Sequence, residues 1–486
     1  MAKRTLLLIP LILCLISPEA FTFAREKIEL SLSDCLNIGL GHNLDIKIAK
    51  IESRLKGEDV TLARSIFDST ITGKVAYTDD QRAQASTIFG TQSITTEYEF
   101  GVETKLPLGT EIEIDYFDNR EWTDSAFAVQ NPLHRAELAL TLRQPILKNS
   151  FGYVDRNNVK FSKIEAETAG IKALDRVEEA IADIEKAYWN LAFHYNNVGL
   201  RKKLLIDAGE LYDIFKKHFK TGLAESTEVY EVESNMRIRK AELAIAENDL
   251  ESASNSLKLL LNEGDNFIII PKNKLMALGY RANLADSLKE AFTANRDYRI
   301  KKNELEAKKI TLKMKENELW PEVDLVGTLA INGVHGKFTK ANRRLTTNKH
   351  SEYYGGIEIS IPLENRAARG AYNKADLEKE KAVLELIKIE KEIAVNVDRD
   401  VRDVNLSHEN AFRWAKIKDL QYQKFKDEEK KLKYGRSNSK TVIDYQNDLT
   451  RAALSEYSAM LEYYSAMVDL ENEKDTLLFT VGVLAK

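Results

Sequence analysis

The chain is poor in the residues that break or cross-link a polypeptide. Only eight prolines and two cysteines occur among its 486 residues, and no stretch rich in Pro, Gly and Ser divides it. Cys14 lies in a segment that we expect to be removed, which leaves Cys35 as the one remaining thiol. An exported protein with a single cysteine has no internal disulfide, so its stability must come from packing.

Sequence motifs of enzymes and of nucleic-acid binding are also missing. The net charge is −5 and no basic run of five or more residues occurs, so nothing argues for nucleic acid as a partner. There is no phosphate-binding loop and no His-Glu-x-x-His motif, and Gly39-Leu40-Gly41 lacks the third glycine of a dinucleotide site. The seven histidines are scattered without the spacing of metal ligands. We therefore expect no enzymatic activity, no cofactor and no metal.

Long hydrophobic runs are absent, apart from one near the start of the chain. Lys3 and Arg4 precede an apolar run over 6–16, and Ala24 closes a plausible cleavage site. The run is shorter than the roughly 20 apolar residues that span a bilayer. We predict that residues 1–24 are a signal peptide, with a buried N-terminal helix as the alternative.

What the chain does have is a sequence that is written twice. Two pairs of segments match in register, namely 32–45 with 284–297 and 222–229 with 435–442. Each copy, the first over 25–264 and the second over 284–486, reads as a helix, strands, a very long helix and a shorter helix. Such a duplicated unit predicts a symmetric assembly.

The two longest predicted helices, 153–220 and 366–434, are too long for the core of a compact domain. At ~1.5 Å per residue each would extend for roughly 100 Å. Apolar residues in the first helix recur at alternating steps of three and four, which is typical of a coiled-coil seam. These residues are Ile181, Ile184, Tyr188, Leu191, Tyr195 and Val198.

The other predicted helices are about half as long, over 33–66, 225–262, 284–319 and 439–480. Two of them laid end to end equal one long helix. This arithmetic predicts a cylinder wall in which pairs of short helices stack beside each long one. Between the copies, 265–283 is predicted to be a small belt element on the outside of the cylinder.

Between the helices, the apolar period changes to two, which predicts strands with one apolar and one polar face. We predict four strands within 68–145 and two within 321–362. Strands of about ten residues, many aromatic residues and the export signal favour a membrane β-barrel. A soluble sheet with one wet side is the alternative.

Six strands cannot close a barrel around a water-filled lumen, and unpaired strand edges are not tolerated in lipid. Several copies of the chain must therefore share one barrel. The extra hairpin of the first copy, around Gly109, is interpreted either as part of the wall or as an extracellular loop.

The motifs that punctuate the two copies resemble, in their order, those of the TolC-type outer-membrane efflux protein family. That family has an Asn step early in each repeat, a Leu-x-Pro entry into the strands and a Pro-Leu or Pro-Ile exit. Each long helix then ends in a Gly turn, followed by an acidic-Val helix start. Here these motifs read as Asn43-Leu44-Asp45, Asn295-Arg296-Asp297, Leu319-Trp320-Pro321, Pro145-Ile146-Leu147, Pro362-Leu363, Phe219-Lys220-Thr221-Gly222 and Glu228-Val229.

The resemblance covers nearly the whole mature chain and implies an α+β membrane protein. It implies a homotrimer with one β-barrel in the lipid of the outer membrane and a coiled-coil α-helical barrel through the periplasm. The barrel would meet the helices at Pro145, Pro321 and Pro362. The implied partners are a periplasmic adaptor (membrane fusion) protein and an inner-membrane pump of the RND, ABC or MFS type. The cargo, drug, metal or protein, is left open.

In the resembled family the Gly turns form the periplasmic tip, which contacts the adaptor and tapers to a gate. The corresponding residues here are Gly222, Leu223 and Gly435. A helix cap is the local role that we expect for both glycines, because a positive φ closes a helix at low cost in glycine.

Acidic residues just after the second turn ring the pore in that family. Matched from Gly435, these positions are Thr441 and Asp444, and their first-copy counterparts are Glu228 and Glu231. The alternatives are carboxylates that stabilise the helix dipole or a solvated helix face. Arg436 is a candidate to hold a closed state by pairing with a neighbouring acid, and the alternative is an exposed tip residue without a specific role.

The resulting hypothesis is an export duct. The competing hypothesis, from another class, is a non-conducting periplasmic scaffold or tether with a soluble sheet and coiled-coil helices. A single-channel current favours the first, and an elongated particle purified without detergent favours the second.

Overall fold

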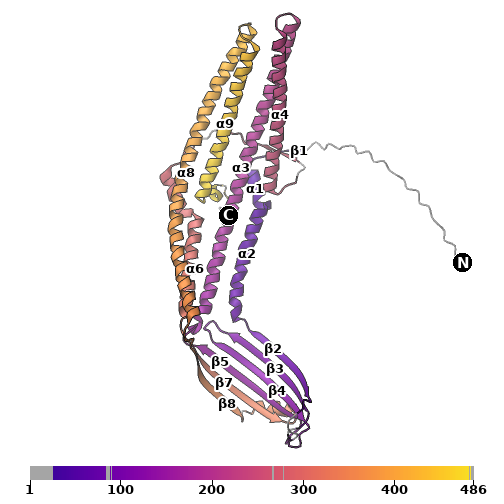
Figure 1. Ribbon diagram of the computed structural model, residues 1–486, viewed down its shortest axis with the longest axis vertical. Coiled ribbons are helices and arrows are strands. Elements are labelled where there is room, and N and C mark those ends of the chain that lie inside the picture. Colours follow the sequence, from indigo (N-terminus) through magenta and orange to yellow (C-terminus); the bar gives the residue numbers. More distant parts are fainter. Residues whose placement is uncertain are drawn as a thin grey trace, which may run out of the picture.

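The computed structural model describes residues 26–83, 88, 90–264, 267–276, 279–347, 349–480 and 482. The predicted signal peptide, 1–24, lies outside the described residues. The molecule is elongated, with a curved sheet at one end and two helical hairpins reaching the other (Figure 1). This arrangement, a duplicated unit of helices, strands and a long helix, is the one that the sequence predicts.

Two helices run almost the whole length of the helical part, from the sheet to the far tip (Figure 1). They are α3 (Tyr153–Lys220) and α8 (Arg366–Lys433), each of 68 residues. Most of the predicted seam of α3 is buried in the main core, including Ile181, Ile184 and Leu191. Tyr195 is the exception, because it is 43% exposed, whereas the last seam residue, Val198, is buried again.

The shorter helices flank the long ones in end-to-end pairs. They are α1 (Leu32–His42), α2 (Leu44–Arg64), α4 (Ser226–Leu261), α5 (Leu284–Ala294), α6 (Arg296–Asn317), α9 (Ser439–Glu473) and α10 (Leu477–Thr480). Among the described residues, no helix combines the length and apolar composition needed to cross a bilayer.

Asparagine joints break the two helices that we expected to be continuous over 33–66 and 284–319. The Asn43 side-chain oxygen accepts the N–H of Ile46 at 3.0 Å, and Asn295 accepts that of Tyr298 at 2.8 Å. Asparagine is a preferred N-cap, so the repeated Asn step starts a second helix instead of continuing the first. Each Asn amide also donates to the end of the neighbouring short helix, to the carbonyl of Leu260 (2.7 Å) in one copy and of Glu473 (3.4 Å) in the other.

The helix predicted over 439–480 is likewise broken. It stops at Glu473, and Asp475 adopts a left-handed backbone with φ of 58°. The short α10 then folds back onto α3, where the N–H of Leu477 donates to Glu178 at 2.7 Å.

The sheet has six strands, all antiparallel, in the order β2-β3-β4-β5-β7-β8. Four belong to the first copy and two to the second, as the alternation predicts. They are β2 (Thr70–Asp80), β3 (Ser93–Lys105), β4 (Glu111–Thr123), β5 (Leu133–Pro145), β7 (Glu322–His335) and β8 (Ser351–Ser360). One-turn 3-10 helices at Ser65–Phe67 and Ser150–Gly152 lie at the junctions with α2 and α3.

The strand register places apolar side chains on one face of the sheet and charged ones on the other. Ile114 lies opposite Leu140, which lies opposite Leu329, so apolar residues of neighbouring strands share a face. This face is bare in the single chain: the side chain of Val75 is 75% exposed and that of Ile357 is 63% exposed.

Ion pairs cross the strands on the opposite face. The Lys74 ammonium lies 3.0 Å from Glu97 and 3.1 Å from Glu99. The Arg143 guanidinium lies 3.1 Å from Asp324 and 2.6 Å from Glu358. A sheet with one apolar face and one ion-paired face suits lipid on one side and water on the other.

The hairpin around Gly109 is part of the continuous sheet, because β3 and β4 pair along their whole length. Its turn points toward the helices. A Cβ added to Gly109 would lie 2.6 Å from the backbone nitrogen of Gly152, which precedes α3. Of the two interpretations left open by the sequence, the structure favours the wall.

Three prolines stand where sheet and helices meet. Pro145 is the last residue of β5, Pro321 immediately precedes β7, and Pro362 follows β8 by two residues. Proline has no N–H to donate to a strand ladder, so it suits these ends.

The belt segment contains β6 (Phe267–Pro271), which pairs in parallel with β1 (Glu26–Leu30) about half-way up the helical part (Figure 1). The sequence analysis missed β1. The pair is fixed to α3 by the Tyr188 hydroxyl, which donates to the carbonyl of Leu30 at 3.2 Å.

Candidate gate and docking tip

The end of the molecule far from the sheet carries two turns, one in each copy, with the same backbone geometry. In the first, Gly222 has a φ of 75° and its N–H donates to Phe219 O at 3.1 Å. The N–H of Leu223 donates to His218 O at 2.8 Å. These two bonds form a Schellman motif, which ends α3 with its last carbonyls satisfied.

The second turn repeats the motif. Gly435 has a φ of 68°, and its N–H donates to Leu432 O at 2.9 Å. The N–H of Arg436 donates to Lys431 O at 2.8 Å. No atom lies within 4 Å of a Cβ added to either turn glycine, so the backbone dihedral, and not lack of space, calls for glycine here.

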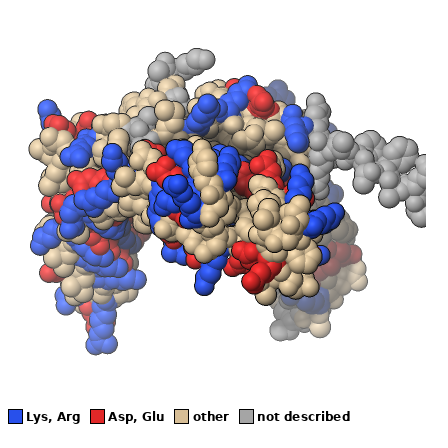
Figure 2. All heavy atoms as spheres, turned by 90° about the horizontal axis from the view of Figure 1, so that it is seen from above, with Lys and Arg blue, Asp and Glu red and all other residues tan. Residues whose placement is uncertain are grey.

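Large side chains project from both turns into solvent. Leu223 is 75% exposed and Tyr434 is 81% exposed. Figure 2, which views the molecule from this end, shows Lys and Arg dispersed over it with Asp and Glu between them. Exposed apolar residues ringed by charge are typical of a surface that contacts another protein.

Two of the four positions proposed for the pore ring take part in the N-terminal caps of helices. The Glu228 carboxylate accepts the N–H of Glu225 at 3.1 Å, which completes a capping box at the start of α4. The N–H and the hydroxyl of Thr441 both donate to Asn438, each at 2.9 Å. The helix-terminus alternative therefore suits Glu228, whereas Thr441 carries no carboxylate and is bound by the Asn438 cap. The ring positions stay a prediction.

The other two positions differ from each other. Glu231 accepts a hydrogen bond from the hydroxyl of Ser439, so it ties α4 to the start of α9. The side chain of Asp444 is exposed and forms no hydrogen bond or ion pair with any residue that the structure describes. Arg436 is also exposed and, within the described part of this chain, forms no ion pair.

The second turn is held by contacts of Glu428, a residue near the end of α8. The Glu428 carboxylate accepts from the Ser437 hydroxyl at 2.6 Å and lies 2.9 Å from the Lys431 ammonium. These two partners hold the pKa of Glu428 below its ordinary value, the Ser437 hydrogen bond contributing most. The carboxylate therefore stays ionised and keeps the turn fixed in mildly acidic conditions.

A buried arginine joins the two hairpins, and the sequence analysis missed it. Arg239 of α4 is only 4% exposed, and its guanidinium donates to Asn447 of α9 and, at 3.0 Å, to Glu242. Glu242 also accepts from Arg201 of α3 at 2.7 Å. The available signal was periodicity, because Arg239 follows Val232 by seven residues, on the stripe of α4 that is buried.

A small apolar core lies beside this polar link. It joins the first and second sequence repeats of the chain and consists of Leu211, Phe215, Val232, Phe425 and Val442. Among the described residues, the two hairpins of the tip are thus joined by this apolar cluster, by the arginine network and by the Ser439–Glu231 hydrogen bond.

Comparison with known proteins gives a consistent result for the fold. No protein-family model matches the sequence, and no curated protein matches it significantly. Solved structures do match. The Campylobacter jejuni CmeC outer membrane channel aligns over 92% of this chain and 85% of its own, with 13% identity and a TM-score of 0.67.

Two further solved structures match this chain over a similar length. CusC aligns over 92% of each chain with 11% identity and a TM-score of 0.69. The open state of the MtrE outer membrane channel of Neisseria gonorrhoeae aligns over 91% of this chain and 88% of its own, with 14% identity and a TM-score of 0.66. The chain has the fold of outer-membrane channels. The expected fold class is thereby confirmed for the single chain.

Proposed function

We propose that three copies of this chain form an outer-membrane duct that exports small molecules or proteins. The observation that carries the proposal is the two-faced sheet joined to two 68-residue helices. The apolar face would contact lipid, and the ion-paired face would line water.

The sheet edges argue for a shared barrel. In this chain β2 and β8 end the sheet, so each presents one unpaired edge. Lipid does not tolerate such edges, but pairing β8 of one copy with β2 of the next would satisfy them. Three copies would supply eighteen strands, as many as in barrels with an aqueous channel.

The location follows from the same arrangement. The barrel would lie in the outer membrane and the helices would extend into the periplasm, as in the channels of the same fold. The exposed Leu223 and Tyr434 would meet a periplasmic adaptor, which connects the duct to an inner-membrane pump of the RND, ABC or MFS type. Residues 1–24 would direct export and then be removed.

The tip is the gate in this proposal, with Asp444 as its central residue. Asp444 is the ring candidate whose side chain has no partner among the described residues, so its charge is available to the pore. Three copies near one axis would favour cations and repel one another. Arg436 of a neighbouring copy would be within the same ring of charges and would stabilise a closed state.

The test uses the full chain purified from outer membranes in detergent and placed in planar bilayers. The parent should conduct with a preference for cations, and Asp444→Asn should weaken that preference. Glu228→Gln is the matched control, because its carboxylate caps α4 and should leave selectivity unchanged. A chain that purifies without detergent and carries no current would instead support the periplasmic scaffold.

A further inference from the structure

One connection between strands, 336–350, is strongly basic and contains a helix. The helix is α7 (Phe338–Leu345), and it connects the far ends of β7 and β8, away from the helical part. No Asp or Glu occurs in 336–350. Its basic residues, apart from His350, are Lys337, Lys340, Arg343, Arg344 and Lys349.

The apolar side of α7 packs onto the sheet. Ala341 and Leu345 are buried against Ala136, with Tyr116 and Ile331 beside them. The helix approaches so closely that a Cβ on Gly333 would lie 2.2 Å from the carbonyl oxygen of Ala341. The position of α7 is therefore fixed by backbone contact and not only by side chains.

The face that α7 covers is the apolar face of the sheet. Side chains on one face of a strand recur every second residue. Ala136 thus shares a face with Leu138, and Ile331 with Leu329, whose side chains are exposed. In the proposed duct this face contacts lipid, so α7 lies on the lipid side at the end of the barrel far from the helices.

A group of hydrogen-bonded polar residues lies on the sheet beside α7. The Tyr116 hydroxyl donates to Asn342 at 2.8 Å, and the amide of Asn342 donates to Asp118 at 3.2 Å. His134 lies 2.9 Å from the other oxygen of Asp118. The lipid-side face therefore changes from apolar to polar here, as it would at a membrane interface.

The cations on the outer side of α7 have no acidic partner. Lys337, Lys340 and Arg343 are exposed, and none forms an ion pair with a residue that the structure describes. Arg344 donates to the carbonyl of Val334. The nearby carboxylate of Asp118 is fully buried and already engaged, whereas cations on the opposite face, such as Lys74 and Arg143, are paired.

We propose that α7 binds the phosphate groups of anionic lipids in the outer leaflet that surrounds the barrel. A short helix with an apolar side on the membrane boundary and a cationic side without acids suits an anionic headgroup layer. Phe338, which is half exposed and contacts the ring of Tyr98 edge-on at 6.5 Å, would sit among the headgroups as interfacial aromatics do. The inference rests on the proposed membrane-embedded function.

The test is lipid selectivity of the full chain in phosphatidylcholine bilayers that contain spin-labelled phosphatidylglycerol or spin-labelled phosphatidylcholine. The motionally restricted fraction of each label measures which lipid contacts the protein. The parent should select phosphatidylglycerol, and added salt should reduce the preference. The combined change Lys337→Gln, Lys340→Gln and Arg343→Gln should lower it, by up to about fivefold for each cation removed at low ionic strength.

Two matched variants accompany it. Lys337→Arg, Lys340→Arg and Arg343→Lys keep the charge and should keep the preference. Lys47→Gln, Lys50→Gln and Lys391→Gln remove the same charge from the helical part and should change nothing.

A parent that inserts into the bilayer without preferring phosphatidylglycerol would overturn the inference and leave the duct intact. Selectivity that persists in the triple glutamine variant would also overturn it. A chain that does not insert at all would overturn the proposed function, and the inference with it.

Discussion

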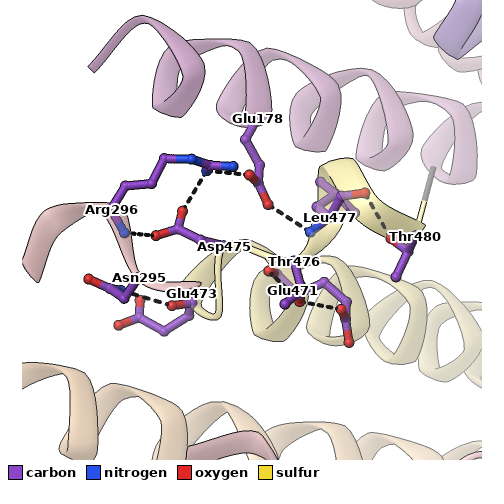
Figure 3. A network of polar contacts seen from close by, with 9 residues as sticks. All are labelled: Glu178, Asn295, Arg296, Glu471, Glu473, Asp475, Thr476, Leu477 and Thr480. Atoms are coloured by element: carbon purple, nitrogen blue, oxygen red, sulfur yellow. Dashed lines mark hydrogen bonds and ion pairs between the residues drawn. The ribbon is translucent and has the colours of Figure 1, made fainter. Parts of the chain in front are cut away.

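At the residue scale, the most unusual feature is a buried charge cluster between α3, the start of α6 and the end of α9 (Figure 3). Arg296, at the start of α6, contacts Glu178 of α3 and lies 2.8 Å from Asp475, beyond the end of α9. One cation faces two carboxylates there, and all three residues are buried. The cluster therefore connects three helices and holds the C-terminal turn in place.

The cluster should make stability depend on pH. Burial raises the pKa of Asp475 from 3.8 to about 6, with Glu178 and Asp297 adding to the rise and Arg296 opposing it. The folded state then binds a proton more tightly than the unfolded chain. Stability from this group is thus gained as pH falls through 6 toward 4 and lost as pH rises through that window.

We expect the apparent unfolding midpoint of Asp475→Asn to change less than that of the parent between pH 7.5 and pH 4.5, followed by circular dichroism. Asparagine tolerates the left-handed backbone at this position, so the variant should fold. Burial and then the charge of Asp475 also raise the pKa of Asp175 to about 6, so the variant loses part of this second contribution as well. Equal pH responses would show that Asp475 is ionised throughout.

Arg296→Met should destabilise the chain strongly, because it leaves Glu178 and Asp475 buried without a cation. Breaking a buried pair in this way costs about 3–5 kcal/mol. Arg299→Met is the matched control, since Arg299 is exposed on the same helix. Thermal unfolding of both variants checks this, and a shift no larger than that of the control would contradict it.

At the scale of elements, the asparagine joints explain how two short helices stack beside a long one. Each Asn starts one helix and holds the end of another, in both copies. A loss of the N-cap costs about 1 kcal/mol, and loss of the second hydrogen bond adds about as much.

Asn43→Ala should therefore lower stability more than Asn295→Ala, because its bond to Leu260 is the shorter one, 2.7 Å against 3.4 Å for Asn295. Asn43→Asp keeps the cap acceptor and loses the donor, so it should fall between the parent and Asn43→Ala. Denaturant unfolding measures all three, and an order in which Asn295→Ala is the least stable would refute the assignment.

The link between the hairpins gives a functional prediction. A hydrogen bond to a charged group contributes about 1.5–3 kcal/mol, so Arg239→Gln should raise the open-to-closed ratio of the tip on the order of tenfold or more. Arg237→Gln, at an exposed residue paired within α4 with Glu233, is the control. Single-channel open probability reports the difference, and identical values would place the gate elsewhere.

Periodicity alone predicts the long helices and the division of strands into four and two. Periodicity did not predict the helix breaks at Asn43 and Asn295, because the apolar period continues across them. Only the hydrogen bonds of the caps reveal the start of a new helix. The strand β1 is five residues long and owes its existence to pairing with β6, which is distant in sequence. The ring positions of Glu228 and Thr441 stay a prediction; the structure adds that Glu228 completes the capping box of α4 and that Thr441 donates to the N-cap Asn438.

At the scale of the whole molecule, two unpaired edges and a bare apolar face leave the single chain incomplete. A closed assembly would satisfy both at once, with the edges paired and the apolar face in lipid. The long helices would then continue the lumen beyond the membrane. Trimer formation is thus the central claim, because the duct, the ring of Asp444 residues and the lipid-facing α7 all depend on it.

The most direct measurement is the mass of the intact particle released from detergent, by native mass spectrometry of the full chain. We expect three copies that hold together only when a detergent or lipid is present during purification. A single copy that stays soluble without detergent would contradict it.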